Sequence, residues 1–154
     1  HQAEDIWQNI PECQRQGLKS ILLSDWVKEN DEWNNEQLEE DFAKILKSRE
    51  IVTKAIEPLR ADKKVGSSLE VAVYIKSPDA ELLKANEDEL SNIYITSQAY
   101  VTEEKPADVL NEYTENDTTV WVVKAQGEKC ARCWKYAELN ENGICKHCAD
   151  AINE

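Results

Sequence analysis

Four cysteines near the end of the sequence place the strongest constraint on how this chain folds. Cys130 and Cys133 form one C-x-x-C step, and Cys145 and Cys148 form a second after eleven intervening residues. In each step a tight turn directs two sulfur atoms at one ion, while backbone N–H groups of the turn donate to those sulfurs. The intervening loop is long enough to close a tetrahedron with metal–sulfur distances of about 2.3 Å. The spacing therefore predicts one zinc ion held by four thiolates.

Two other uses of these cysteines remain open from spacing alone. Disulfides need an oxidising compartment, but no secretory signal is visible, and C-x-x-C is a poor geometry for a structural cross-link. Iron in a rubredoxin-like centre uses the same four thiolates, so the sequence does not separate iron from zinc. In either metal site four protein ligands leave no position for water. The ion is therefore expected to be structural and not catalytic.

The segment around these cysteines has little apolar mass of its own. Its expected core residues are Leu139, Ile144, Trp134 and Tyr136. Metal binding should therefore supply most of its folding free energy, about 10–16 kcal/mol in small zinc peptides. Four thiolates around a divalent ion leave a negative cluster. The nearby cations either offset that charge or contact phosphate groups, with Trp134 and Tyr136 as stacking faces. These cations are Lys129, Arg132, Lys135 and Lys146. His147, between two ligand cysteines, is expected to be an exposed residue.

Charge is distributed unevenly along the chain. The net charge of −13 argues against a nucleic-acid partner. Residues 65–123 carry three cations and twelve anions, and residues 1–35 carry three and seven. Residues 36–64 balance at seven each, and residues 124–154 balance at five each. An RNA partner is therefore expected to contact the ends of the chain and to avoid its acidic middle.

Length and composition bound the class of protein. The 154 residues suit one ordinary domain or two small ones. The chain contains no Met and begins with His1, so we expect it to be part of a longer protein. No apolar run approaches the roughly eighteen residues of a membrane span, and no membrane partner is expected. Cys13 is the odd cysteine, and a reduced thiol in a cytoplasmic protein is its simplest interpretation.

Hydrophobic periodicity predicts one long helix over residues 35–60, after a short helix at 3–9. We expect its apolar stripe to pack against other helices, and Pro58 to end or kink it near residues 55–57. Residues 1–35 are too short to cover the stripe, which again indicates sequence beyond this chain. The stripe consists of Leu38, Phe42, Ile45, Val52, Ile56 and Leu59.

After Gly66 the pattern changes to alternation, which predicts a small α+β module with a mostly antiparallel sheet. A short helix is predicted at 79–86 and an acidic surface loop at 103–117. Strands are predicted at 69–75, 93–96, 98–102 and 118–124. The whole chain is thus expected to be α+β, with divisions at 1–64, 65–126 and 127–154.

Three stretches carry a resemblance to bacterial isoleucyl-tRNA synthetases. Residues 127–134 (Gly-Glu-Lys-Cys-Ala-Arg-Cys-Trp), followed by Cys145-x-x-Cys148, resemble the C-terminal zinc finger of that family. Residues 20–26 (Ser-Ile-Leu-Leu-Ser-Asp-Trp) resemble a segment late in its helical anticodon-binding domain. Glu57-x-x-Arg60 and residues 65–70 resemble its helix-to-strand junction. The three matches occur in the family's order and together span nearly the whole chain.

The sequence departs from the family pattern at a few positions. Leu22 stands where the family usually has His, and Val27 where it usually has Pro. His147 replaces a basic residue common between the last two cysteines, and the loop between the cysteine pairs is short. These differences bear on individual RNA contacts more than on the fold or the metal.

The resemblance implies an ATP-dependent ligase that joins isoleucine to its tRNA in protein biosynthesis. Residues 1–64 would end the anticodon-binding domain, 65–126 would form a junction module, and 127–154 would form the zinc finger. ATP and isoleucine would bind outside this chain, because two His and no Met exclude the family's catalytic signatures. The implied partner is isoleucine tRNA, held at its anticodon stem-loop by a monomeric protein. Lys129, Arg132 and Lys135 would position phosphates, and Trp134 would stack on a base.

Two other classes of protein compete with this interpretation. A DNA-repair glycosylase has a similar finger, but that class begins with a nucleophilic Pro followed by Glu, whereas this chain begins with His1 and Gln2. The predicted long helix also fits that class badly. A zinc-stabilised module that binds protein and no RNA is favoured by the negative net charge.

Overall fold

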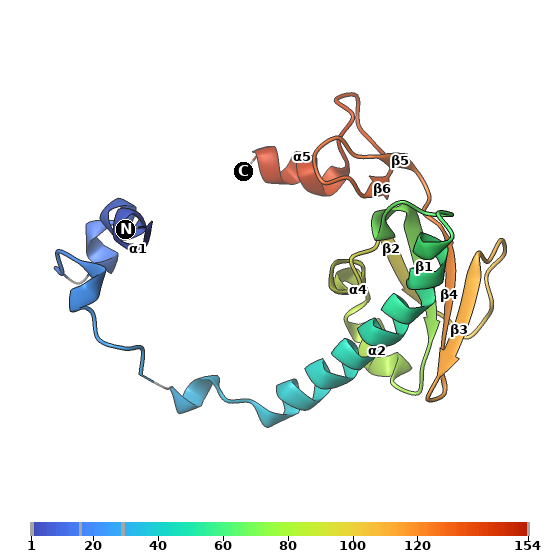
Figure 1. Ribbon diagram of the computed structural model, residues 1–154, viewed down its shortest axis with the longest axis horizontal. Helices are drawn as coiled ribbons and strands as arrows, with labels where there is room; N and C mark the ends of the chain where they lie inside the picture. The colour runs from blue at the N-terminus through green and yellow to red at the C-terminus, as the bar shows by residue number, and fades with distance from the viewer. Residues whose placement is uncertain (1, 16, 29, 154) are drawn as a thin grey trace. The chain divides into compact units, whose positions relative to one another are not determined.

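A computed structural model describes residues 2–15, 17–28 and 30–153 of the chain (Figure 1). It divides into two compact units, His1–Asn35 and Glu36–Glu154, and each is described by itself. The reduced thiol predicted for Cys13 falls on a side chain outside the description.

The first unit is a short helix with three 3-10 turns. Helix α1 (Gln2–Asn9) confirms the helix predicted at 3–9, and the turns span Glu12–Gln14, Ile21–Leu23 and Asp31–Trp33. Trp7 is its buried anchor, and the indole Nε1 donates to the carbonyl of Leu18 at 3.2 Å. The Glu4 carboxylate accepts from the Ser20 hydroxyl at 2.8 Å and from the Ile21 N–H at 3.3 Å. These bonds lower the pKa of Glu4 and hold residues 20–21 against the helix.

The second unit begins with the long helix α2 (Glu36–Ala61), which confirms the helix predicted at 35–60. Glu36 and Glu39 lie in its first turn and Arg60 in its last, where each charge complements the helix dipole. The expectation that Pro58 ends the helix near 55–57 is wrong. Pro58 lies in the last turn, where its ring costs one backbone hydrogen bond, and the buried neighbours Ile56 and Leu59 hold that turn on the core.

Four of the six residues in the predicted apolar stripe of α2 are buried in the second unit. Ile45, Val52, Ile56 and Leu59 are buried, whereas Leu38 and Phe42 are 62% and 49% exposed. These buried residues pack mainly on strands β3 and β4, so a sheet takes most of the place of the helices that were expected to cover them. A sheet can cover the same apolar face, because the hydrophobic periodicity of a helix does not specify whether a helix or a sheet packs against it.

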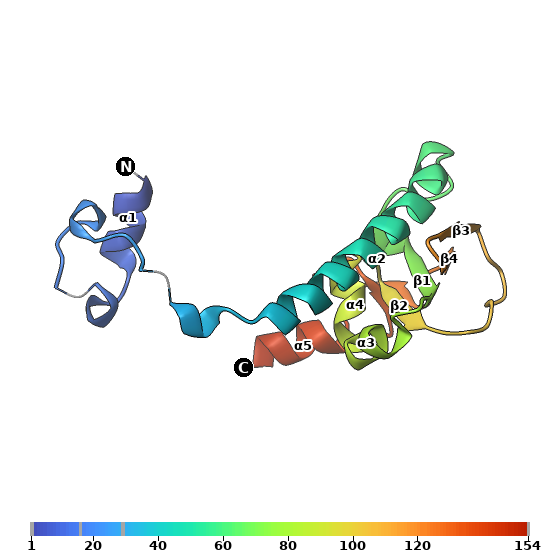
Figure 2. The same ribbon diagram turned by 90° about the horizontal axis from the view of Figure 1, so that it is seen from below.

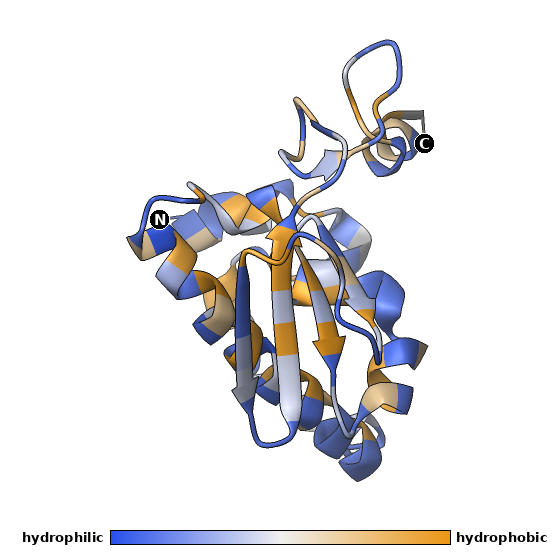
Figure 3. Cartoon of the chain, turned by 90° about the vertical axis from the view of Figure 1, so that its right-hand side faces the viewer, coloured by the Kyte–Doolittle hydropathy of each residue, from blue (hydrophilic) through white to orange (hydrophobic). Residues whose placement is uncertain are grey.

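The sheet contains four strands in the order β2-β1-β4-β3. Their bounds are β1 (Val71–Lys76), β2 (Gln98–Val101), β3 (Asn111–Glu115) and β4 (Thr118–Lys124). Strand β4 pairs antiparallel with both β1 and β3, while β2 runs parallel to β1, so the sheet is mostly antiparallel as predicted. Hydrophobic residues concentrate on the central strands, and edge strand β3 is largely hydrophilic (Figure 3).

One hydrophobic core lies between this sheet and three helices, α2, α3 (Ala80–Ala85) and α4 (Glu87–Ile93). The helices lie on one side of the sheet, and the connection 102–110 lies on the other (Figure 2). Val71, Val73 and Ile75 from β1 alternate into this core, with Leu83 of α3 and Leu90 of α4 opposite them. The predicted α+β class is therefore confirmed.

Two secondary-structure predictions in this module are wrong. The strand predicted at 93–96 is the end of α4 and a turn, because Leu90 and Tyr94 share one buried helical face and the Tyr94 hydroxyl pairs with Ser48 Oγ at 2.7 Å. The loop predicted at 103–117 contains β3. Asn116 and Asp117, with φ of 49° and 60°, form the two-residue turn between β3 and β4. Such a hairpin turn needs positive φ at both residues, and Asn and Asp adopt positive φ more readily than most residues.

The last part of the chain, residues 127–153, forms a small lobe that we call the finger. It contains β5 (Glu128–Lys129), β6 (Tyr136–Ala137) and α5 (Lys146–Asn153). Within the described ranges, no helix is both long and apolar enough to cross a membrane.

The two halves of α2 should differ in their contribution to stability. Ile56→Ala removes a buried side chain from the core and is expected to lower the free energy of unfolding of the second unit by about 2–4 kcal/mol. Phe42→Ala, on the exposed half, is the matched control and should cost less than about 1 kcal/mol. Urea unfolding followed by NMR signals of the sheet measures both. Equal losses would show that the core extends along the whole helix.

Candidate metal centre

The four cysteines converge on one point, as their spacing predicts. Cys130, Cys133, Cys145 and Cys148 are free thiols whose sulfur atoms all lie within 4.8 Å of one another. The Sγ atoms of Cys133 and Cys145 are 3.7 Å apart. Four sulfurs at about 2.3 Å from a tetrahedral ion are separated by about 3.8 Å, so this spacing fits a metal centre and is too long for a disulfide. The four residues can hold one metal ion.

Backbone geometry prepares one of these thiols for ligation. The N–H of Cys145 donates to Cys130 Sγ at 3.4 Å, and backbone N–H groups of Cys133 and Cys145 lower the pKa of Cys130 to about 6. Burial acts in the opposite direction on its neighbours. It raises the pKa of Cys133 to about 12 and also raises the pKa of Cys145. Without a metal, therefore, part of the cluster holds protons that an incoming cation must displace.

Two turns place these sulfurs. In the first, the Cys130 N–H donates to the carbonyl of Lys135 at 2.9 Å, and the Trp134 N–H returns to the carbonyl of Cys130 at 3.0 Å. The second follows a loop closed by Asn140, whose side-chain oxygen accepts from the N–H of Asn142 at 3.0 Å and of Ile144 at 3.2 Å. Cys145 then precedes α5, which carries Cys148. Each C-x-x-C step is thus fixed by local hydrogen bonds.

The finger has a minimal core. Ala137, Leu139 and Ile144 are partly buried against the cysteines, as predicted for Leu139 and Ile144. Trp134 is not part of this core, and the expectation that it would be is wrong, since its side chain is 62% exposed. With so small a core, the finger is expected to depend on a bound ion for its stability.

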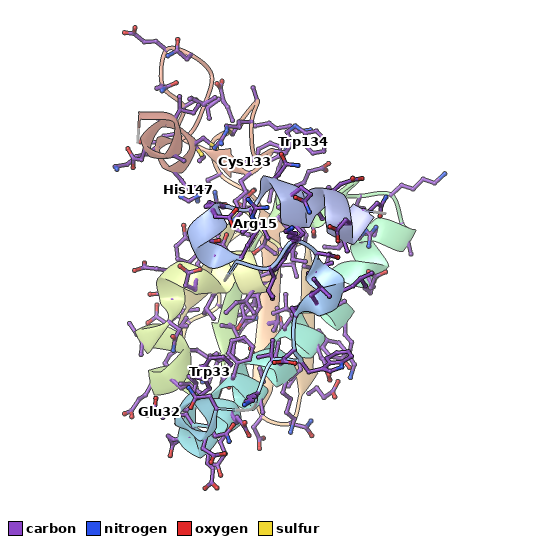
Figure 4. The ribbon with its side chains drawn as sticks, turned by 90° about the vertical axis from the view of Figure 1, so that its left-hand side faces the viewer. Arg15, Glu32, Trp33, Cys133, Trp134 and His147 are labelled. Carbon is purple, nitrogen blue, oxygen red and sulfur yellow. The ribbon has the colours of Figure 1, made fainter. Side chains whose placement is uncertain are left out.

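The predicted nucleic-acid residues divide into two groups. Lys129 Nζ lies 5.3 Å from the centroid of the Trp134 ring, and Arg132 and Trp134 are exposed on the first turn. Trp134 and His147 flank Cys133 in Figure 4. Lys135 is directed elsewhere, because its Nζ donates to Ser91 Oγ at 3.1 Å and to Asn92 Oδ1 at 2.5 Å. Burial there lowers the pKa of Lys135.

A junction between the finger and the sheet was not predicted from the sequence. Ser97 and Gln98, at the start of edge strand β2, hydrogen-bond to main-chain groups of Gln126 and Tyr136. A cleft of about 810 Å³ opens beside this junction, between α4 and the finger. Because Ser97 and Tyr136 are 39 residues apart in a chain without a repeat, no sequence pattern marks their meeting.

Metal affinity is expected to rise with pH. Ligation requires thiolates, and at pH 7 Cys133 and Cys145 are protonated while Cys130 is largely ionised. The logarithm of the zinc association constant should therefore rise by at least two per pH unit between pH 6 and 8, because Cys133 and Cys145 must each release a proton. Below about pH 6 Cys130 also gains a proton, so the slope of log K against pH increases by about one more. Competition titration against a chromophoric chelator measures this slope, and an affinity independent of pH would contradict the thiolate site.

Gly127→Ala should weaken the finger more than the same change at Gly143. Gly127 has φ of 91°, and a Cβ there would lie 2.5 Å from the carbonyl carbon and oxygen of Ala137, so β5 and β6 must separate. Gly143 has φ of 70° with open space around it, and alanine there costs only the backbone strain of about 1 kcal/mol. Less chelator should strip the metal from Gly127→Ala than from Gly143→Ala. Equal chelator resistance would show that β5 and β6 are not packed this closely.

Comparison with known proteins agrees with this arrangement. No family model matches the chain. Curated isoleucine–tRNA ligases do match it, from Microcystis aeruginosa at 34% identity over 99% of this chain and from Natranaerobius thermophilus at 35% over 97%. The enzyme of Crocosphaera subtropica is 34% identical over 99% of this chain. The chain spans only 17–18% of the length of these relatives. Over nearly its whole length, this chain is therefore related to one part of the isoleucine–tRNA ligases.

Proposed function

We propose that this chain is the tRNA-holding part of an isoleucine–tRNA ligase, with zinc in the four-cysteine site. Residues 1–64 would complete the anticodon-binding domain, 65–126 would form the junction, and 127–154 would grip the anticodon stem-loop. Activation of isoleucine with ATP, and its transfer to tRNA, would take place in other parts of the enzyme in the cytoplasm. The relatives match across the whole chain, which favours this class over a DNA-repair glycosylase that shares only the finger.

The backbone at Trp134 is the observation that carries the RNA-binding proposal. Trp134 has φ of 67°, in the left-handed region where a bulky residue costs about 1–2 kcal/mol and glycine costs nothing. The first turn would thus be more stable with glycine at this position. Instead it holds the largest side chain, 62% exposed and outside the core. Strain at an exposed aromatic residue is better explained by binding than by folding.

The surroundings of Trp134 suit an unpaired base of RNA. Lys129 Nζ lies over the indole ring at 5.3 Å, and exposed Arg132 lies on the same turn. An aromatic face with adjacent cations is the usual surface for a splayed base and its phosphate. We propose Lys129, Arg132 and Trp134 as direct contacts. Lys135, bonded to α4, would contribute a phosphate contact only through its remaining N–H.

Zinc is the ion that the donor set favours. Four thiolates in a tetrahedron select zinc or iron among the common metals, and zinc adds no redox chemistry to a site that holds a fold together. When bound, the ion would supply structural cross-linking and nothing more, because all four positions are taken by cysteine.

Trp134→Gly separates folding from RNA binding. Glycine relieves the strain, so zinc affinity should stay equal or rise, whereas loss of stacking should raise the Kd for isoleucine tRNA about tenfold. Filter binding at several salt concentrations gives both the Kd and its salt dependence.

Arg132→Ala in the same assay should reduce the slope of log K against log salt by about one, because it removes a phosphate contact.

Trp33→Ala is the matched control for Trp134→Gly, because it also removes an exposed tryptophan (73%) but lies in the first unit. It should leave the Kd within about twofold. An unchanged Kd in Trp134→Gly would remove that ring from the RNA surface. If the unaltered, zinc-loaded chain binds isoleucine tRNA no better than a non-cognate tRNA, the acidic surface and net charge of −13 favour the protein-interaction module instead.

A further inference from the structure

The finger joins the rest of the second unit through a single crossing of the chain, at residues 125–127. Gly127 lies at that crossing with φ of 91°, a conformation that glycine adopts without strain. One covalent link with a glycine in it does not define an orientation. The orientation of the finger must therefore come from noncovalent contacts across the junction.

We propose that Ser97 and Gln98 are positioning residues that fix the orientation of the finger on the sheet and thereby set its affinity for RNA. They would do so without touching RNA themselves. The effect on affinity rests on the function proposed above, whereas the effect on orientation does not.

The Gln98 side chain hydrogen-bonds to two segments at the base of the finger, Gln126 before it and Tyr136 in β6. Its Nε2 donates to the carbonyl of Gln126 at 3.1 Å and to the carbonyl of Tyr136 at 2.6 Å. Its Oε1 accepts from the N–H of Gln126 at 3.2 Å. Both N–H bonds of the amide are thus used, one to the chain entering the finger and one to strand β6 ten residues later.

Ser97 adds a second side-chain hydrogen bond to Tyr136 of β6. Its hydroxyl accepts from the N–H of Tyr136 at 2.7 Å and donates to the carbonyl of Leu69 at 2.5 Å. The N–H and the C=O of Tyr136 are therefore bound by adjacent side chains of the sheet. Ser97 is itself buried, so an unpaired N–H at this point would be costly.

Lys135 supplies a third point of attachment, to Ser91 and Asn92 on α4. Gln126 and Tyr136 are bound by Gln98 of β2, whereas Lys135 is bound to α4, and attachments to two separate elements restrict the rotations that one covalent link leaves. Trp134 directly precedes Lys135, so the attachment that holds Lys135 also aims the exposed ring. A junction of this kind converts a flexible tail into a surface with a defined direction.

Gln98→Glu tests the orientation directly. The carboxylate keeps the size of the side chain but places oxygen against the carbonyls of Gln126 and Tyr136 in place of the donor. In the zinc-loaded chain without RNA, residual dipolar couplings from residues 36–126 and from the finger should fit one alignment tensor in the unaltered protein. They should need two in Gln98→Glu. Unchanged zinc stoichiometry and unchanged sheet signals show that both parts remain folded.

Gln126→Glu is the matched control, because it adds the same charge at the same junction. Gln126 joins the junction through its main-chain N–H and C=O, which the substitution preserves. It should retain one tensor and a Kd for isoleucine tRNA within about twofold. Gln98→Glu should raise that Kd about tenfold with an unchanged salt slope, since no phosphate contact is lost.

Lys135→Met serves as a second variant if Gln98→Glu unfolds the finger. It should also need two tensors, while the salt slope reports whether Lys135 contacts phosphate. One tensor in both variants would overturn the inference, and so would two tensors with an unchanged Kd. If the unaltered chain binds no tRNA, the proposed function fails and the effect on affinity fails with it. The dipolar couplings would still decide the orientation.

Discussion

The convergence of four sulfur atoms on one point is the constraint on which the C-terminal finger depends. The finger buries little besides its cysteines, Ala137, Leu139 and Ile144, so it lacks the hydrophobic burial that holds the sheet and α2 together. A bound ion would replace that burial with metal–sulfur bonds. The local hydrogen bonds around Cys130 and Asn140 make the two turns ready to receive it.

A metal-bound lobe is useful only if it faces in a defined direction. The sheet provides this through polar contacts, in which Ser97, Gln98 and Lys135 replace the apolar interface that a larger domain would have. Hydrogen bonds suit this role because they fix angles as well as distances. The strained, exposed Trp134 lies beside Lys129 on this lobe, whose four cysteine sulfurs converge on one point.

The charge distribution fits this division of work. Residues 65–123 are strongly acidic, whereas residues 36–64 and the finger are each balanced between cations and anions. The finger presents the exposed cations Lys129 and Arg132 at its first turn. A polyanion would thus be directed to the finger and away from the acidic surface of the sheet. The half of α2 that carries Leu38 and Phe42 stays outside the core of the second unit.

Sequence alone determined the elements whose cause is local. Cysteine spacing predicted the convergence of the four sulfur atoms, the 3.6-residue period predicted α2, and alternation predicted β1, β2 and β4. Tertiary structure decided the rest. Burial of Leu90 and Tyr94 turned an expected strand into the end of α4, packing on the sheet carried α2 past Pro58, and pairing with β4 made β3 out of an expected loop. The junction of Ser97 and Gln98 with the finger was also invisible in the sequence, because its partners are main-chain atoms of distant residues, and main-chain atoms are the same in every sequence.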